Sequence, residues 1–392
     1  MNKINYFKII ALVFLLSIGC SKESAVDINN GSDTDKENTN EGNNPEEKVT
    51  LAPDIFKKST EGYSCFRIPA IVKTKDNTLL AFAEGRVRNC KDEGDINLVL
   101  RRSTDNGKTW SDLIMVWDDA DNTCGNPSPV VDLETGTVHL LMTWNLGEDR
   151  IGDINAGISK DTRRVYYTRS VDDGLTWETP KEITSQVKDP SWGWYATGPV
   201  HGIILTKEPY KGRIVVPCDY IEVGAGRKGY SHVIYSDDNG VTWKIGGKSV
   251  GGNESTVAEL SDGRLMLNMR NSSPYRTVAY SEDGGETWSP SKQDYALPDP
   301  TCQASLLNGF AEGKHTLFFS NAASSSRVNM TIKKSIDDGK TWPYFYVVNE
   351  GPSAYSDVVM ISDSEIGILY ENGKNNPYEK ISFEKIKIQK IN

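Results

Sequence analysis

The sequence feature that most constrains the fold is an eight-residue pattern, Ser-x-Asp-x-Gly-x-Thr-Trp, which occurs five times without a mismatch. Successive copies begin 67, 66, 45 and 54 residues apart. Self-similarity at such spacings indicates a repeat architecture, in which each unit packs against its neighbours. The copies occupy residues 103–110, 170–177, 236–243, 281–288 and 335–342.

Each copy has the chemistry of a β-hairpin turn. An alternating stretch typical of a strand precedes every copy. Within the copy, we expect the Asp side chain to bond turn amides and the Gly to supply a positive φ. The Trp should then start the returning strand and pack beneath the turn. The spacing leaves room for four antiparallel strands per repeat, and radial repetition of such sheets protects their edges.

The repeat resembles the Asp-box of sialidases, whose family fold is a six-bladed β-propeller. The resemblance implies an all-β, six-bladed propeller over residues 51–392, in which one blade lacks a box. We expect residues 66–72 to close the ring by pairing with the C-terminal strands, since 381–391 alternates well. The boxes themselves favour a structural role, so function must be argued from other residues.

The stretch Phe66-Arg67-Ile68-Pro69 resembles the FRIP motif of bacterial exo-sialidases (neuraminidases) and stands before the first box, as in that family. The resemblance implies that Arg67 is the first of three arginines that hold the carboxylate of sialic acid. Arg270 and Arg327, which lie eight to eleven residues before a box, are the other two. A carboxylate is well matched by planar, bidentate guanidinium donors that stay charged at any working pH.

A second motif, at residues 82–86 (FAEGR), is followed by an acidic loop. By resemblance, Arg86 helps to bind substrate and Asp92 is the general acid/base. Asp95 is the alternative acid/base, because the match around Asp92 is short. The alternative without a catalytic role is that these acidic residues only keep a surface loop hydrated.

The resemblance further implies that Tyr355 is the nucleophile and Glu254 the base that activates it. The reacting carbon of sialic acid already bears a carboxylate, which would repel an approaching Asp or Glu. A neutral phenol avoids that repulsion and still gives a covalent intermediate. Its ordinary pKa near 10 explains why a carboxylate must stand beside it. Glu371, which follows an expected strand, should orient Arg67.

An aromatic, Gly-rich stretch at 191–198 (SWGWYATG) lies between two boxes. Trp194 or Tyr195 could line the sugar pocket from here. Packing in the core is an equally good interpretation of both side chains.

The N-terminus predicts export. Lys3 precedes an apolar run at 9–18 that ends at Gly19-Cys20, too short to span a bilayer and typical of a signal peptide. It resembles a bacterial lipoprotein signal, which implies a signal peptide at 1–19, a lipidated Cys20 and a disordered tether at 20–50. An ordinary cleaved signal with an incidental Cys20 is the alternative. We expect a protein anchored to a bacterial membrane, at the outer membrane or cell surface.

Composition limits the partners. The net charge of −10 argues against nucleic acid and requires a local positive pocket for an anionic substrate. Five cysteines follow Cys20 at irregular spacings, so the pairing of any disulfide stays open. The four scattered histidines do not suggest a metal site, and the resemblance implies no cofactor.

The sequence therefore predicts a monomeric, retaining exo-α-sialidase that acts on sialylated glycans. A trans-sialidase or a KDN-preferring sialidase would share every residue named above. A propeller that binds sialic acid without turnover is the alternative outside the enzymes.

Overall fold

Short antiparallel strands dominate the computed structural model, which describes residues 53–226, 228–249 and 251–392. Within these residues the strands are interrupted by α1 (Ile151–Ala156), α2 (Thr184–Val187) and the 3-10 helix η1 (Ile388–Lys390). The predicted all-β class is confirmed. No helix in the described part of the chain is long and apolar enough to cross a membrane. The predicted signal peptide, Cys20 and the tether lie outside the described residues.

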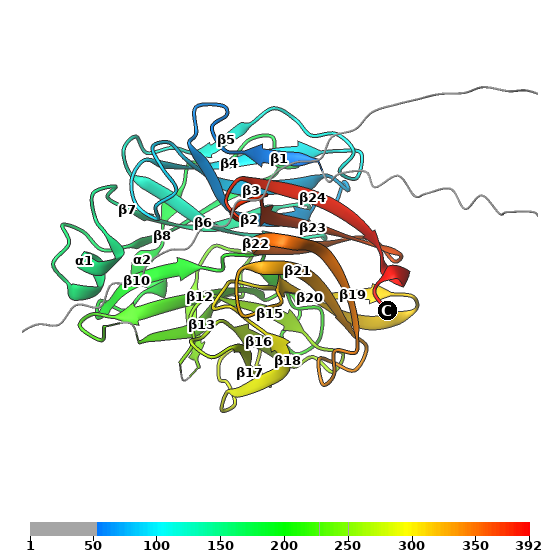
Figure 1. The fold of residues 1–392 in the computed structure, drawn as a ribbon. Helices are drawn as coiled ribbons and strands as arrows, with labels where there is room; N and C mark the ends of the chain where they lie inside the picture. Colours follow the sequence, from blue (N-terminus) through cyan, green and yellow to red (C-terminus); the bar gives the residue numbers. More distant parts are fainter. Residues whose placement is uncertain (1–52, 227, 250) are drawn as a thin grey trace, which may run out of the picture. The chain divides into compact units, whose positions relative to one another are not determined.

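The strands, labelled in Figure 1, form four sheets. We divide these sheets into six antiparallel sets, called blades 1 to 6, because the eight-stranded sheet contains blades 1 and 2, joined by a parallel bridge between β4 and β6, and the seven-stranded sheet contains blades 5 and 6. Blade 1 contains β2 (Cys65–Lys73), β3 (Leu79–Arg86), β4 (Ile96–Ser103) and β5 (Ile114–Trp117). Blade 2 contains β6 (Thr123–Val131), β7 (Val138–Asn145), β8 (Arg164–Ser170) and β9 (Lys181–Glu182). Blade 3 contains β10 (Trp192–Thr197), β11 (Ile203–Ile204), β12 (Ile214–Glu222), β13 (Gly229–Ser236) and β14 (Lys244–Lys248), and both β10 and β11 pair with β12.

The remaining strands form the other three blades. Blade 4 contains β15 (Ser255–Glu259), β16 (Leu265–Met269), β17 (Tyr275–Ser281) and β18 (Lys292–Pro298). Blade 5 contains β19 (Ser305–Ala311), β20 (Lys314–Ala322), β21 (Val328–Ser335) and the first half of β22 (Tyr344–Ser362). Blade 6 contains the second half of β22, β23 (Glu365–Asn372), β24 (Lys380–Lys387) and β1 (Asp54–Lys57). The long strand β22 therefore belongs to two blades.

Six hydrophobic clusters lie between successive blades and connect them in a closed order. One cluster joins blades 1 and 2. Four others join blades 2 and 3, blades 3 and 4, blades 4 and 5, and blades 5 and 6. The sixth joins blade 6 back to blade 1, where Phe383 of β24 and Phe56 of β1 pack with Phe66 of β2. This cyclic order is the one that the predicted six-bladed propeller requires.

The predicted partner of the closing strand is wrong. The C-terminal strand β24 pairs with β23 and with β1, through Phe56↔Ile381 and Lys57↔Lys380 (Figure 1). Residues 66–72 lie in β2 instead, which pairs with β3 in blade 1. The alternation in the C-terminal segment marked a strand but could not specify its neighbour.

The five Asp-boxes are turns of one geometry. In the copy at 236–243, the Thr242 amide and hydroxyl donate to Asp238 at 2.8 and 2.6 Å, and the Gly240 amide donates to Ser236 Oγ at 2.9 Å. Gly240 has a φ of +80°. Contrary to the prediction, the box tryptophans do not start the returning strands but lie one to four residues before them. They pack in the clusters between blades: Trp110, Trp177, Trp243, Trp288 and Trp342.

Candidate active site

The predicted site residues all lie at one end of the blades. Arg67 is at the start of β2 and Glu371 at the end of β23. Glu254 immediately precedes β15 and Arg270 immediately follows β16. The Asp-boxes follow the opposite ends of these hairpins, for example after β4 and β17. The boxes and the candidate site therefore lie on opposite faces of the blades, which supports a structural role for the boxes.

Arg67 is clamped by a buried carboxylate. Its Nε and Nη2 donate to the two carboxylate oxygens of Glu371 at 3.0 and 3.1 Å, and Glu371 is fully buried. The Ile68 amide donates to the same carboxylate at 3.0 Å while Ile68 holds a φ of +60°. Such a φ is costly for a β-branched residue. The register of β2 against β3 shifts between Arg67 and Ala70, so a bulge lies beside the Arg67–Glu371 pair.

Tyr355, on β22, lies against the same carboxylate and against a second one. Its backbone amide donates to Glu371 at 3.1 Å. Its hydroxyl donates to Glu254 Oε1 at 2.5 Å and accepts a bond from Arg270 Nη1 at 3.1 Å. Arg270 also forms an ion pair with Glu254. The phenol is thus paired with a carboxylate and a guanidinium at once.

Three guanidinium groups surround the Tyr355 ring. Those of Arg67 and Arg327 lie 4.9 and 5.6 Å from its centroid, and Arg270 binds its hydroxyl. Burial, followed by the charge of Glu254, raises the pKa of Tyr355 well above 10, and Arg270 and Arg67 offset part of that rise. The resting side chain is therefore a neutral phenol, whose proton must leave to a base during any attack.

Arg327 reaches the site from the β20–β21 loop. Its Nη1 donates to the Tyr378 hydroxyl at 2.7 Å and its Nη2 donates to the Thr301 carbonyl at 3.3 Å. The Arg67 guanidinium also lies 4.3 Å from the centroid of the Tyr378 ring. Tyr378 therefore supports two of the three predicted carboxylate-binding arginines.

Asp92 lies at the mouth of the site, on the β3–β4 loop. Its Oδ1 is 2.9 Å from Arg86 Nη1 and 3.8 Å from Arg67 Nη1, and its side chain is 61% exposed. The protein around Asp92 partly desolvates its carboxylate, which on its own raises the pKa of Asp92, but Arg86 and then Arg67 outweigh this and bring the pKa below its ordinary value. Arg86 itself is buried and also donates to Glu84 Oε2 at 2.6 and 3.0 Å.

Asp95, the alternative acid/base, has a different electrostatic environment. The charges that act on it come from Arg88, Asp118 and Asp121, and its pKa is raised, chiefly by burial. The carboxylate that meets Arg67 and Arg86 is that of Asp92. The geometry therefore favours Asp92 over Asp95.

Trp194 and Tyr195 of the aromatic stretch have different surroundings, and Tyr195 fits the interpretation of packing in the core. Tyr195 is fully buried in the cluster between blades 2 and 3, so its interpretation as a pocket-lining residue is wrong. Trp194 is half-buried, and the Arg163 guanidinium lies 3.8 Å from its ring centroid. Trp194 and Tyr195 are neighbours on β10, so their side chains point to opposite faces of the strand and meet different surroundings.

Three residues near the site were given no role from the sequence, although Glu84 lies within the motif at 82–86. Glu84 and Tyr378 hold arginines, as described above. Asp219, a fully buried acid on β12, accepts a bond at 3.0 Å from Asn253, the neighbour of Glu254. Burial, followed by Glu254, raises the pKa of Asp219 well above its ordinary range. A lone Asp, Glu or Tyr is common, and only the fold shows that these lie together.

A disulfide joins Cys65 and Cys90, with the Cα atoms 5.3 Å apart. The sequence left this pairing open. The other cysteines of the described residues, Cys124, Cys218 and Cys302, are free and buried. Among these residues, no cluster of three or more His, Cys, Asp or Glu side chains could hold a metal.

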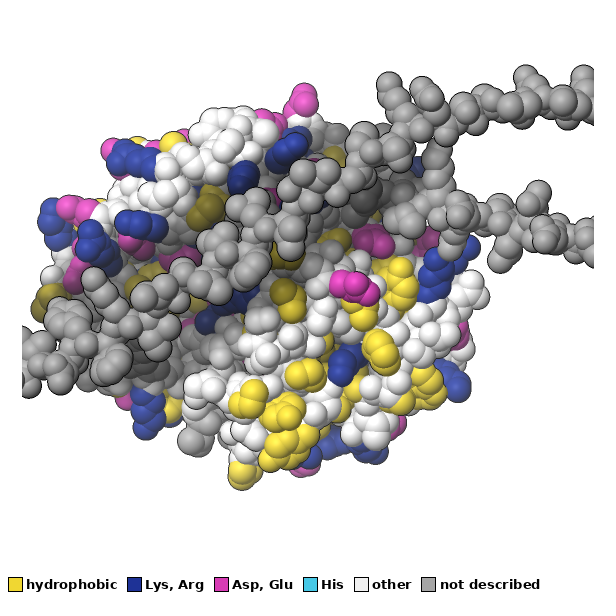
Figure 2. All heavy atoms as spheres, viewed as in Figure 1, with side chains coloured by type: hydrophobic (Ala, Val, Ile, Leu, Met, Phe, Trp, Pro, Cys, Tyr) yellow, Lys and Arg dark blue, Asp and Glu magenta, His cyan; other side chains and the backbone are white. Residues whose placement is uncertain are grey.

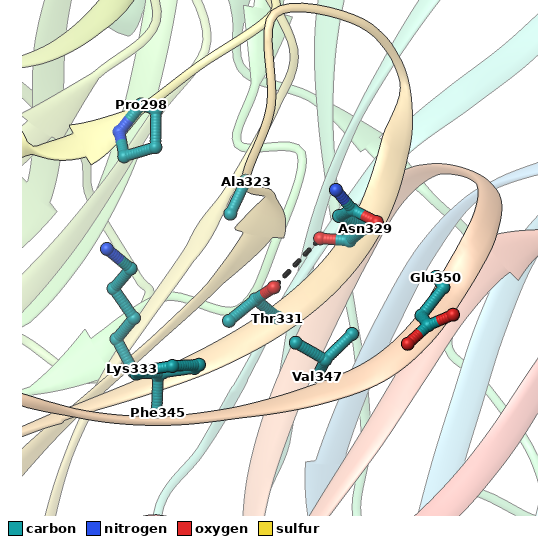
Figure 3. Close-up of a pocket in the computed structure, with 8 residues that line it drawn as sticks. All are labelled: Pro298, Ala323, Asn329, Thr331, Lys333, Phe345, Val347 and Glu350. Atoms are coloured by element: carbon teal, nitrogen blue, oxygen red, sulfur yellow. Dashed lines mark hydrogen bonds between the residues drawn. The ribbon is translucent and has the colours of Figure 1, made fainter.

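A cavity of about 640 Å³ lies outside this site, against blade 5 (Figure 3). Thr331 and Lys333 of β21 and Phe345 and Val347 of β22 line it, and Pro298 faces them from blade 4. Hydrophobic side chains also gather over the lower part of the face seen in Figure 2. None of the predicted site residues lines this cavity.

Comparisons with known proteins agree with the geometry. The model of the BNR repeat-like domain matches residues 77–368. An exo-alpha-sialidase of Aspergillus fumigatus is 34% identical over 340 residues, which cover 79% of this chain and 79% of that protein. The chain belongs to the sialidase family. A sialidase of Micromonospora viridifaciens is 36% identical over 351 residues, which cover 85% of this chain.

The family also accounts for the fold. A solved structure named Hadza microbial sialidase Hz136 superposes with a TM-score of 0.79 at 32% identity, covering 87% of this chain and 69% of that one. The chain spans about half, 54%, of the length of the Micromonospora sialidase. What the chain shares with that sialidase is therefore one part of a longer protein.

Proposed function

We propose that this protein is an exo-α-sialidase that hydrolyses terminal sialic acid from glycans with retention of configuration. The observation that carries the proposal is the Tyr355–Glu254 pair at 2.5 Å within a ring of three arginines. The names of the relatives, sialidase and exo-alpha-sialidase, support the same activity.

Arg67, Arg270 and Arg327 are the binding site for the substrate carboxylate. All three approach Tyr355 from different blades, so a carboxylate next to the reacting carbon would lie above the phenol. Glu371 and Tyr378 keep the guanidinium groups in position before substrate arrives, which lowers the ordering cost of binding. This local positive charge offsets the net charge of −10 of the chain.

The first step is attack by the Tyr355 oxygen on the anomeric carbon. As the C–O bond forms, the phenol proton passes to Glu254, and the bond to the leaving sugar oxygen breaks. Asp92 gives its proton to that oxygen, so that the glycan leaves as a neutral alcohol. Arg270 stabilises the negative charge that develops on the Tyr355 oxygen, to which it already donates.

The second step returns the enzyme to its starting state. Asp92, now ionised, takes a proton from water, whose oxygen attacks the anomeric carbon. The bond to Tyr355 breaks and its oxygen recovers the proton from Glu254. Two inversions give net retention, and Tyr355, Glu254 and Asp92 all regain their starting protonation states, with Asp92 taking its new proton from water.

Substrate binding should itself prepare the acid. Arg67 and Arg86 hold the pKa of Asp92 low in the free protein. The negative charge of a substrate carboxylate bound to Arg67 offsets the positive charge that Arg67 presents to Asp92, and this raises the pKa of Asp92. The carboxyl then takes up its proton in the complex, where it is needed.

Turnover of a fluorogenic aryl sialoside tests the proposed activity directly. The full chain should release the fluorophore, and Tyr355→Phe should abolish most of the release while the protein stays folded. Wild-type protein that binds sialic acid without turnover would contradict the proposal and indicate a binding propeller. A panel of α2,3, α2,6 and α2,8 sialosides then defines the linkage preference.

We also propose that the protein is held at a membrane through a lipidated Cys20. The support is the apolar run and Gly-Cys ending of the N-terminal sequence, which lies outside the described residues. A multiply acylated cysteine holds a protein firmly, whereas one acyl chain binds reversibly. Cys20→Ala should move activity from the membrane fraction to the soluble fraction. Equal fractionation of variant and wild type would contradict the anchor.

A further inference from the structure

Strand β2 carries both Arg67 and Cys65, which is one end of the disulfide, and the adjacent strand β3 carries Arg86. In the β2–β3 register, Cys65 lies opposite Arg86 and Arg67 lies opposite Glu84. Side chains two apart on a strand share a face, so these four side chains project from one face of the hairpin. The residue that meets both arginines there is Asp92.

The disulfide fixes the loop that carries Asp92. Cys90 lies two residues before Asp92, and its bond to Cys65 ties the tip of the loop to the start of β2. The Cys90 carbonyl accepts a hydrogen bond from Arg86 Nη1 at 2.6 Å, the same nitrogen that pairs with Asp92. The base of the loop is closed by the Val87 amide, which donates to the Asp95 carbonyl at 3.0 Å. The loop is thus held at its base and at its tip.

The carboxylate of Asp92 needs such support because it is 61% exposed and its closest ionic contacts are with arginines. One of these, Arg67, is a proposed ligand of the substrate carboxylate. Substrate therefore competes with Asp92 for Arg67, and protonation of Asp92 weakens the pair with Arg86 as well. In the complex, the backbone of the loop must keep the acid in place.

We propose that the Cys65–Cys90 disulfide is a positioning element for the general acid, holding the loop so that Asp92 reaches the leaving oxygen once substrate has engaged Arg67. The inference rests on the proposed function, because it assigns Asp92 to proton donation. Without the disulfide, the arginine pocket and the Tyr355–Glu254 pair remain. The step that becomes slower is proton donation by Asp92.

The leaving group separates this role from a merely structural one. A sugar alcohol needs a proton as it leaves, whereas an activated aryl group needs little. For Cys90→Ser, we expect kcat/KM on 3′-sialyllactose to fall about tenfold, within the ~10²-fold that a 1 Å misplacement can cost. On a 4-methylumbelliferyl sialoside the same variant should stay within about twofold of wild type, since general-acid assistance is small there. A loss of folded protein would lower both rates equally.

Four further variants sharpen the test. Cys65→Ser removes the same bond from the other side, and the double variant should be no worse than either single variant. Asp92→Asn gives the leaving-group dependence expected when the acid is lost altogether. Cys124→Ser alters a buried free cysteine and should leave the ratio of the two rates at its wild-type value.

The outcomes distinguish this inference from the function on which it rests. Wild-type protein that turns over neither sialoside contradicts the proposed function. Active wild type with an unchanged rate ratio in Cys90→Ser overturns the positioning role, as does peptide mapping of the exported protein that finds Cys65 and Cys90 unlinked. A raised ratio in both single variants and no further rise in the double variant supports it.

Discussion

The Tyr355 hydroxyl donates to Glu254 Oε1 at 2.5 Å, and Arg270 Nη1 binds both partners. Glu254 and Arg270 meet across the β15–β16 pair, where the Arg270 amide donates to the Glu254 carbonyl at 2.9 Å. One hairpin therefore supplies both Glu254, which accepts the proton of the phenol, and Arg270, which stabilises its anion. In the proposed mechanism, this arrangement is what allows a side chain with a raised pKa to act as a nucleophile.

Glu254→Gln should lower kcat by about 10²–10⁴-fold, because an amide cannot accept the phenol proton and general-base assistance is of that size. Tyr355→Phe should lower kcat further, since it removes the attacking oxygen. Both variants should still bind sialic acid, as isothermal titration can measure. Retention of near wild-type kcat in either variant would remove that residue from the mechanism.

Arg270→Lys should lower kcat/KM by at least about tenfold, because hydrogen bonds between charged groups contribute roughly 1.5–3 kcal/mol and lysine lacks the planar fork. Arg264→Lys is a matched control. Arg264 lies at the other end of the same hairpin, paired with the exposed Asp262, and exposed pairs contribute little. Equal kinetics for the two variants would show that Arg270 does not hold the substrate.

The pH profiles of kcat and kcat/KM should differ on their basic limbs. Proton donation requires protonated Asp92, so the rate falls as pH rises through its pKa. Arg86 and Arg67 lower that pKa in the free protein, which kcat/KM reports, and bound substrate raises it in the complex, which kcat reports. The basic limb of kcat should thus lie at higher pH. Coincident limbs would contradict substrate-induced protonation, and Asp95→Asn should leave both in place.

The parts of the fold that depend on local sequence could be predicted. An Asp-box is complete within eight residues, so its Asp, Gly and Thr determine the turn without help from elsewhere. For Asp105, the hydrogen bonds from Thr109 lower the pKa of the carboxyl far below its usual range. The strands before the boxes were likewise predictable, because alternation is a local property.

Contacts between distant segments could not be predicted in the same way. The alternation of the C-terminal segment did not reveal that its partner is β1, which begins at Asp54. Cys65 and Cys90 were two of five candidates without a distinguishing spacing. Arg67 and Glu371, 304 residues apart, were linked through the family resemblance alone. Tyr378 holds Arg327 from the β23–β24 loop, and nothing in the sequence indicated that this loop reaches the site.

Phe56→Ala should lower the free energy of unfolding by about 3–5 kcal/mol, as expected for emptying a buried aromatic site. Phe56 is 1% exposed and packs 5.3 Å from the Phe66 ring, joining the closing strand β1 to blade 1. Phe310→Ala, at a side chain that is 60% exposed, should change stability by less than about 0.5 kcal/mol. Urea unfolding measures both. Equal effects would contradict closure of the ring by β1.

The stereochemistry of the first-formed product tests the central claim most directly. If Tyr355 attacks and water then displaces it, two inversions return the α configuration of the substrate. Proton NMR in the first minutes of turnover can identify the anomer of free sialic acid before mutarotation mixes the two forms. The account predicts that the α anomer appears first and the β anomer grows in later. Appearance of the β anomer first would contradict a covalent intermediate on Tyr355, whatever the variants show.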